Sequence, residues 1–255
     1  MIDRLGPTLR PRAFAVMRQR WERLLFLHWP VPADELRPLI PAGLDVDTHD
    51  GQAWIGLVPF VVRSARPVFL PPVPGVSSFA EVNVRTYVHD RGRDPGVWFF
   101  SLDAASRVAV AAARAFFKLG YRFAEMSADG DGESVVFHSR RIAPGPLPAT
   151  CDVRYAPRGE VTRAAPETLE HFLLERYVLY AARGARLYQG RVHHRPYPVQ
   201  GASVDGLRED LVAAAGLRRP AGPPLAHFAS AVDVEVFPIR RLGGEGRTPS
   251  GGGPG

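Results

Sequence analysis

The chain has 255 residues, 45% of them hydrophobic and 23% charged, which is enough to bury one large core or two small ones. Its net charge of +6 comes from scattered arginines without a block of like charge, which argues against a nucleic-acid-binding protein. The single cysteine, Cys151, excludes a disulfide framework and cysteine-rich zinc sites.

The N-terminal residues and the apolar runs indicate where the protein works. Residues 1–20 form a basic arm that lacks the apolar stretch of a signal peptide. No apolar run approaches the length of a membrane span. We therefore expect a cytoplasmic protein with no membrane partner.

The first sixty residues carry signals for several short elements. Pro32 suits the start of a helix, and Pro41 stops it. Pro59 places its strand at a sheet edge or interrupts the strand there. In chain order we expect a short helix over 13–23, a strand over 24–29, a helix over 32–41, and a hairpin of strands 44–47 and 53–62 joined at 49–51.

Residues 79–88 alternate strictly between two kinds of side chain. Because strand side chains have a period of two, one face carries polar groups and the other carries valines and a threonine. The polar face consists of Glu81, Asn83, Arg85 and Tyr87. Its simplest interpretation is a solvated face of an antiparallel sheet. The alternative is a concave site in which Arg85 binds a carboxylate and Glu81 acts as acid or base.

The rest of the chain alternates strands and helices. A helix over 103–118 has an apolar stripe with Val108 and Phe116, which we expect to pack on a sheet, while Asp103 and Lys118 lie on a solvated face. The other expected elements are strands over 97–102, 121–126, 133–139, 187–194 and 229–237, and helices over 166–182 and 203–215.

Arg176 lies inside the apolar stripe of the predicted helix 166–182. A guanidinium in such a stripe needs a partner, because burying an unpaired charge is very costly. It either reaches the edge of the stripe, pairs with a structural carboxylate, or faces a polar cavity. We predict that it is mostly buried and pairs with a carboxylate.

Common catalytic and cofactor motifs are absent from the sequence. It contains no G-x-S-x-G elbow, no phosphate-binding loop and no Rossmann fingerprint. The adjacent His193 and His194 point to opposite faces of a strand, and the spacings typical of zinc sites are missing. We therefore expect neither a metal nor another cofactor.

Four segments together resemble the YqjF-like family, a bacterial family of unknown function. They occur in the family's order and cover roughly residues 20–240. The segments are Leu-Leu-Phe-Leu-His-Trp at 24–29 with Leu-Ile-Pro-Ala-Gly-Leu at 39–44, the alternating strand at 79–88, Gly-Val-Trp-Phe-Phe-Ser-Leu-Asp-Ala at 96–104 with its following helix, and 172–180 with His-Arg-Pro-Tyr-Pro at 194–198.

That family is similar in fold to acetoacetate decarboxylase, which implies a cone-shaped antiparallel sheet, a few helices and an internal cavity. In the decarboxylases a cavity lysine forms a Schiff base with a keto acid, and glutamate and arginine side chains surround it. The matching position lies near Tyr121, where this chain has no lysine; its only lysine is Lys118. The resemblance thus implies a polar cavity, with the polar row of 79–88 facing inward, but no Schiff-base decarboxylation.

We therefore predict a mainly antiparallel α+β domain of the acetoacetate-decarboxylase type over 21–241, between the basic arm and a disordered tail at 242–255. The cavity is predicted to bind a small acidic or carbonyl compound and to support cofactor-free acid–base catalysis. The predicted catalytic residues are Glu81 and Arg85, and the predicted ligand-binding residues are Asn83, Tyr87, Tyr121, Arg176 and His28. The alternative is a non-catalytic binding or sensing module on the same scaffold, and a homo-oligomer is left open.

Overall fold

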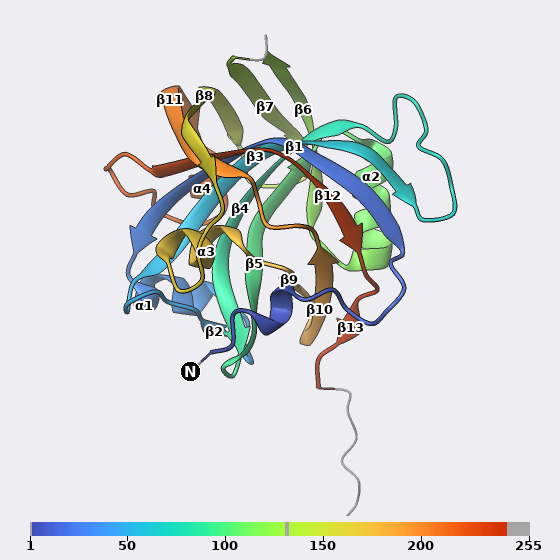
Figure 1. The fold of residues 1–255 in the computed structure, drawn as a ribbon, viewed down its shortest axis with the longest axis vertical. Coiled ribbons are helices and arrows are strands. Elements are labelled where there is room, and N and C mark those ends of the chain that lie inside the picture. The colour runs from blue at the N-terminus through green and yellow to red at the C-terminus, as the bar shows by residue number, and fades with distance from the viewer. Residues whose placement is uncertain (1, 131–132, 244–255) are drawn as a thin grey trace, which may run out of the picture.

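The computed structural model describes residues 2–130 and 133–243 (Figure 1). Within these ranges the strands form one mainly antiparallel sheet of thirteen strands. Their bounds are β1 (Met17–Val31), β2 (Asp45–Val46), β3 (Ala53–Pro67), β4 (Phe79–Asp90), β5 (Arg93–Ala104), β6 (Tyr121–Gly130), β7 (Val135–Ala143), β8 (Thr150–Thr162), β9 (Val178–Arg183), β10 (Arg186–His193), β11 (Val199–Glu209), β12 (Leu225–Val236) and β13 (Arg240–Arg241).

The helices of the described chain are short. They are η1 (Gly6–Thr8), α1 (Ala33–Leu36), η2 (Arg37–Leu39), α2 (Arg107–Ala112), a π-helical turn η3 (Ala113–Phe117), α3 (Leu169–Leu174) and α4 (Leu211–Ala214). None of them is long and apolar enough to span a membrane. The strands therefore set the architecture, and the helices cover parts of it.

The strand pairings close the sheet into two rings. The order is β13-β10-β9-β5-β6-β7-β8-β11-β12-β1-β3-β4-β2, with further pairings of β4 with β5 and of β10 with β12. One ring thus runs through β1, β3, β4, β5, β9, β10 and β12. The other runs through β5, β6, β7, β8, β11, β12, β1, β3 and β4. The strands β1, β3, β4, β5 and β12 belong to both rings. Both faces of β1, β3 and β4 point into an interior, because each face packs in a different core.

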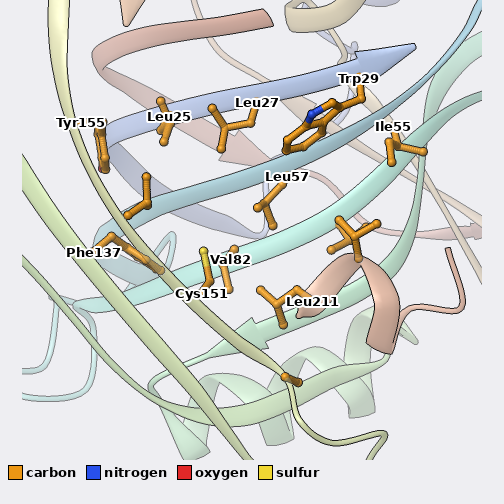
Figure 2. Packing of buried hydrophobic residues seen from close by; sticks show 14 of the residues in the cluster. Leu25, Leu27, Trp29, Ile55, Leu57, Val82, Phe137, Cys151, Tyr155 and Leu211 are labelled. Atoms are coloured by element: carbon orange, nitrogen blue, oxygen red, sulfur yellow. The ribbon is translucent and has the colours of Figure 1, made fainter. Parts of the chain in front are cut away.

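A separate hydrophobic core fills each ring. The first core joins one face of β1, β3 and β4 to the strands β7 and β8, and Figure 2 shows its side chains facing one another. Its members include Leu25, Leu27, Trp29, Ile55, Leu57, Val82, Phe137, Cys151, Tyr155 and Leu211. The second core lies on the opposite face of the same strands, and its members include Leu24, Phe26, Val58, Phe60, Tyr87, Val97, Phe172, Leu173 and Val192.

Helix α3 packs into the second core. Its start is capped by Thr168, whose Oγ1 accepts a hydrogen bond from the backbone N–H of His171 at 3.2 Å. Phe172 and Leu173 are at most 1% exposed, and the Phe172 ring lies 5.0 Å from the ring of Tyr87 on β4. The helix therefore covers the face of β4 that carries the predicted polar row.

The expected strands are present, and the structure extends most of them. The short helix expected over 32–41 is confirmed by α1 and η2. The expected hairpin of 44–47 with 53–62 is wrong, because β2 pairs with β4, and only the bridge between His49 and Gln52 closes the turn. The predicted tail from 244 onward lies outside the described residues.

Four helix predictions need correction, because short apolar runs do not distinguish a helix from a strand by periodicity alone. Residues 13–23 enter β1, and 203–215 consist mainly of β11 followed by α4. The predicted helix 166–182 is only α3 followed by strand β9. The predicted helix 103–118 begins at Arg107, after Ser106 caps α2. Asp103 is instead a fully buried residue of β5.

Pro59 is not at an edge, since β3 lies between β1 and β4. The pairing of β1 with β3 is interrupted between Glu22 and Leu27, where Arg23 has a φ of 55°. Pro59 lies between Leu57 and Val61, in the part of β3 that does not pair with β1. Its missing N–H therefore costs no hydrogen bond between β3 and β1.

The apolar stripe of α2 and η3 does not pack on the sheet as expected. Val108 and Phe116 are 59% and 71% exposed, and Val110 is the buried residue of α2. The helix lies on the outside of the sheet (Figure 1). A surface hollow beside it is lined by Arg107, Val108, Ala111, Ala112, Ala115 and Phe116, none of which is a predicted site residue.

Candidate functional site

The polar row of β4 faces the second core and is buried throughout. Glu81, Asn83, Arg85 and Tyr87 are 6%, 5%, 8% and 0% exposed. The inward orientation that the family resemblance implied is thus confirmed. The valine face of the same strand is also buried: Val82 and Val84 lie in the first core, and Val88 packs in a smaller cluster with Val178 and Tyr180. The solvated interpretation is wrong for both faces.

Glu81 forms one end of the row with Tyr121 of β6. The Tyr121 hydroxyl donates a hydrogen bond to Glu81 Oε1 at 2.9 Å. Burial raises the pKa of Glu81 to about 8, against the lowering effect of this hydrogen bond, and the charge of Asp103 raises it further. The carboxyl group is therefore mostly protonated at neutral pH, with Oε1 held by Tyr121 and Oε2 free to carry the proton.

Arg85 lies in the middle of the row, and it has no carboxylate partner among the described residues. Its Nη2 donates to the carbonyl oxygen of Leu173 on α3 at 3.1 Å. Its guanidinium lies 5.6 Å from the ring of Phe26 and 5.8 Å from the ring of Tyr87. Its Nε is buried and has no hydrogen-bond partner within the described chain. The group is therefore a desolvated cation with donor capacity to spare.

His28 and Tyr87 lie beside Arg85. The Tyr87 Oη is 2.7 Å from His28 Nε2 and 2.8 Å from the Leu173 carbonyl oxygen. Burial lowers the pKa of His28 well below its usual range, and the charges of Arg85 and His227 lower it further. His28 is therefore neutral at neutral pH.

A glycine on β3 makes room for this arrangement. Gly56 pairs with both His28 and Arg85 across the sheet. A Cβ atom at Gly56 would lie 3.1 Å from His28 Cδ2 and 3.3 Å from Arg85 Cγ. The absence of a side chain at this position allows both polar groups to lie over the same piece of backbone.

Arg176 lies beyond the Tyr87 end of the row, in the segment after α3. Its Nη1 is 2.8 Å from Asp47 Oδ2, and its Nε donates to the Phe172 carbonyl oxygen at 2.6 Å. Its guanidinium lies 4.9 Å from the Tyr87 ring. The predicted burial and carboxylate partner are confirmed, although the residue is not part of a helix. The second oxygen of Asp47 accepts a hydrogen bond from Arg4 at 2.5 Å.

Several buried polar atoms in this region have no hydrogen-bond partner within the described residues. Those of the predicted site are His28 Nδ1, Asn83 Oδ1, Arg85 Nε and Arg176 Nη2. An unpaired buried polar atom costs about 1–3 kcal/mol, so several on one face of one interior indicate a site built for a purpose other than stability. We take this set, with Glu81, Tyr87 and Tyr121, as the candidate site.

The structure brings the predicted residues together in two groups. Tyr87 contacts His28, Arg85 and Arg176, and these four residues form the first group. Glu81 and Tyr121 form the second group. At ~3.3 Å per strand residue, Glu81 and Tyr87 lie ~20 Å apart along β4, so Glu81 and Arg176 are at opposite ends of the row.

The match to known proteins covers most of the chain. The family of unknown function DUF2071, described as an uncharacterised conserved protein, matches residues 18–233. The chain belongs to this family. The uncharacterised protein YqjF of Bacillus subtilis (strain 168) is 38% identical over 231 residues, which cover 91% of this chain and 94% of YqjF.

Solved structures of low sequence identity share the fold of this DUF2071 member. The enduracididine biosynthesis enzyme MppR, in complex with the condensation product of pyruvate and imidazole 4-carboxaldehyde, matches with a TM-score of 0.61 at 13% identity, over 92% of this chain and 91% of MppR. An acetoacetate decarboxylase-like enzyme from Sphingomonas wittichii RW1 matches with a TM-score of 0.59 at 12% identity, over 92% and 97%. The acetoacetate-decarboxylase-like fold predicted from the sequence is confirmed.

The only lysine of this family member has a local hydrogen-bond partner. Lys118 follows the turn η3 in a left-handed conformation with a φ of 57°, and its Nζ donates to the carbonyl oxygen of Ala115. It does not lie beside Asp103 as expected, because Asp103 pairs with the buried Arg141 at 2.8 Å.

Sequence reasoning missed several groups of the second interior. Asp47 was not singled out, because nothing local links it to Arg176. Gly56 was not singled out either, although a glycine inside a strand indicates a place where other groups lie close to the backbone. His194 and His227 are buried and each has one ring nitrogen without a partner in the described chain. The described residues contain no group of three or more His, Cys, Asp or Glu side chains that could hold a metal ion.

Proposed function

We propose that this protein binds a small acidic or carbonyl compound among the polar groups of the second interior and acts on it as a cofactor-free acid–base enzyme. Glu81 is the general acid or base, and Arg85 is the anion clamp. Asn83, Tyr87, Tyr121, Arg176 and His28 line the site. A cytoplasmic location, without nucleic-acid or membrane partners, is part of the same proposal.

The observation that carries the proposal is that one buried face of a strand holds both a protonated carboxyl group and an arginine without a carboxylate partner. Glu81 has a pKa of about 8, and Arg85 Nε has no partner in the described chain. Perturbed titratable groups with specific neighbours cluster at functional sites. A carboxyl group with a pKa near the working pH can both give and take a proton.

The chemistry assigned to Glu81 follows from its hydrogen bond to Tyr121. Because Oε1 accepts a hydrogen bond from the Tyr121 hydroxyl, the acidic proton of Glu81 lies on Oε2. Oε2 gives this proton to a ligand oxygen, and the Tyr121 hydroxyl then stabilises the carboxylate that forms. In the reverse direction the carboxylate takes a proton from the ligand. No lysine takes part in this scheme.

A protein of the same fold supports the ligand class. The enduracididine biosynthesis enzyme MppR has been solved in complex with pyruvate, a small keto acid. Its sequence identity of 13% carries only the fold. The carboxylate of such a molecule matches the donors of Arg85.

The proposal is tested with the purified protein in two steps. Native mass spectrometry first identifies any small molecule that co-purifies. Calorimetric titrations with pyruvate and acetoacetate then measure binding, and proton NMR follows conversion of each compound or of the co-purifying one. We expect Arg85→Met to weaken binding at least tenfold, and Glu81→Gln to retain binding but lose turnover.

Two other outcomes have a definite meaning. Binding without turnover of any bound compound supports a non-catalytic binding or sensing module in place of an enzyme. If none of the acids binds and no molecule co-purifies, the proposed site is wrong. The surface variant Arg140→Met, whose pair with Glu125 is exposed, is the matched control for Arg85→Met.

A further inference from the structure

A second surface hollow lies between α2, the turn η3 and strand β6, away from the candidate site. It has a volume of about 300 Å³. The residues that line it are Arg107, Val110, Ala111, Arg114, Phe123 and Pro144. Four of these residues are apolar, two are arginines and none is acidic. We call it the arginine hollow, and none of its residues belongs to the candidate site.

Each arginine of the hollow is held in place by one contact. The guanidinium of Arg107 lies 3.9 Å from the centre of the Phe123 ring. Arg114 Nε donates a hydrogen bond to the carbonyl oxygen of Tyr121 at 2.6 Å. Neither arginine forms an ion pair with a carboxylate in the part of the chain that the structure describes. Their other N–H groups are therefore available to an anion.

The surroundings of the arginine hollow add positive charge. Between Asp103 and Glu125 the sequence holds four basic residues and no acidic one. Asp103 itself is buried and pairs with Arg141. Burial lowers the pKa of Arg122 on β6. The charges of Arg141 and Arg114 lower this pKa further, although Asp103 opposes them. The hollow thus lies in a region of positive potential, which favours an anionic ligand.

We propose that the arginine hollow binds a phosphate monoester of a small apolar group. A carboxylate carries one negative charge, whereas a phosphate monoester carries about 1.5 to 2 at neutral pH and has three strong acceptor oxygens. It can therefore pair with Arg107 and Arg114 at the same time. The apolar group of the ester packs on Val110, Ala111 and Pro144, which a bare phosphate would leave in water. This site is separate from the proposed catalytic site.

The first test is a calorimetric titration of the wild-type protein with phenyl phosphate. Inorganic phosphate, which lacks the apolar group, and benzoate, which carries a single charge, are the comparison ligands. We expect phenyl phosphate to bind at least tenfold more tightly than either of them, and its affinity to fall as the salt concentration rises. Equal affinity for phenyl phosphate and either comparison ligand would overturn the proposal, as would no binding of phenyl phosphate.

The second test uses three variants to locate the bound molecule. Arg107→Met and Arg114→Met each remove one positive charge and should each weaken phenyl phosphate binding at least tenfold. Ala111→Trp keeps both charges but fills the hollow, so it should weaken binding as strongly. The matched control is Arg163→Met, which removes an exposed arginine outside the hollow. This control should leave the affinity unchanged.

The remaining outcomes distinguish the hollow from other places on the protein. If Arg163→Met weakens binding as much as Arg107→Met, phenyl phosphate responds only to the net charge, and the proposal fails. If Ala111→Trp binds as well as the wild type, the molecule lies elsewhere, and the proposal fails again. All the substituted residues are exposed, so the variants should keep the fold. The comparison of the three ligands needs no variant, so it remains decisive in any case.

Discussion

Arg176 and Asp47 form a buried ion pair between segments 129 residues apart, with Nη1 2.8 Å from Oδ2 and side chains 3% and 0% exposed. Asp47 also accepts a hydrogen bond from Arg4 of the N-terminal segment. The pair therefore ties the end of α3 and the N-terminal segment to the loop that follows β2. Its removal would leave a buried carboxylate with only the partly exposed Arg4 for compensation.

Arg176→Ala should consequently lower the free energy of unfolding by about 3–5 kcal/mol, because it breaks a buried pair from one side. Chemical denaturation at neutral pH measures this. The control is Arg10→Ala, which removes an exposed pair with Glu235 and should leave the stability nearly unchanged. Equal, small losses in both variants would mean that Arg176 contributes no more than a surface arginine.

The raised pKa of Glu81 predicts how stability depends on pH. The unfolded chain releases this proton near pH 4.5, whereas the folded protein holds it up to a pKa of about 8. Between these values the folded state binds more protons than the unfolded state, so stability falls as the pH rises. The contribution is fully present below pH 4.5 and is lost progressively up to about pH 8.

The measurement compares the wild type with Glu81→Gln, which keeps the shape but cannot ionise. Denaturation at several pH values between 5 and 8 should show wild-type stability falling relative to the variant by up to about 1.4 kcal/mol per pH unit. Other carboxyl groups act equally in both proteins and cancel in the difference. Parallel curves for the two proteins would show that Glu81 is ionised in the folded state.

Borohydride trapping tests the absence of Schiff-base chemistry. An imine needs an unprotonated amine at the site of the carbonyl compound, and Lys118 instead donates a hydrogen bond to Ala115 at the end of its own helical turn. After incubation with acetoacetate or pyruvate and borohydride, the mass of the intact chain should be unchanged. A reduced adduct mapped to Lys118, and missing in Lys118→Arg, would restore the decarboxylase mechanism.

Gly56→Ala should disturb the site more than the fold. The added Cβ would press on His28 and Arg85 at 3.1 Å and 3.3 Å, so both side chains must shift by a few tenths of an ångström. We expect about a tenfold loss of acid binding and a stability loss of about 1–3 kcal/mol. Gly222→Ala, with no atom within 4 Å of its new Cβ, is the control. Unchanged binding in Gly56→Ala would mean that the two side chains do not position the ligand.

The polar row could be predicted from the sequence because its signal is local. Strict alternation over 79–88 fixes which side chains share a face, and no distant contact is needed to obtain it. The pattern did not reveal that both faces are interior. That fact depends on which strands close the two rings, and those pairings join segments far apart in the chain.

The helix predictions failed for a related reason. In 166–182 only three residues separate the apolar side chains of α3 from the buried strand β9, so the combined pattern resembles one long helix. The burial of Arg176 was predicted correctly from a helix that does not exist. Its true cause is the position of Asp47, which no local pattern could supply. The same holds for the convergence of His28, Arg85 and Gly56 from three different strands.

The sharing of β4 by two rings has a consequence for how the family can change. An ordinary half-exposed strand offers every second position as neutral ground, where substitutions accumulate without effect. From Ala80 to Val88, β4 offers none, because all of these residues are buried. Val82 and Val84 pack in the first core, and the polar row faces the opposite interior. A bulkier residue among the valines would push the strand toward the opposite interior, because close-packed cores transmit strain. A substitution on the valine face of β4 can therefore change the positions of the polar side chains on its other face, although it touches no ligand.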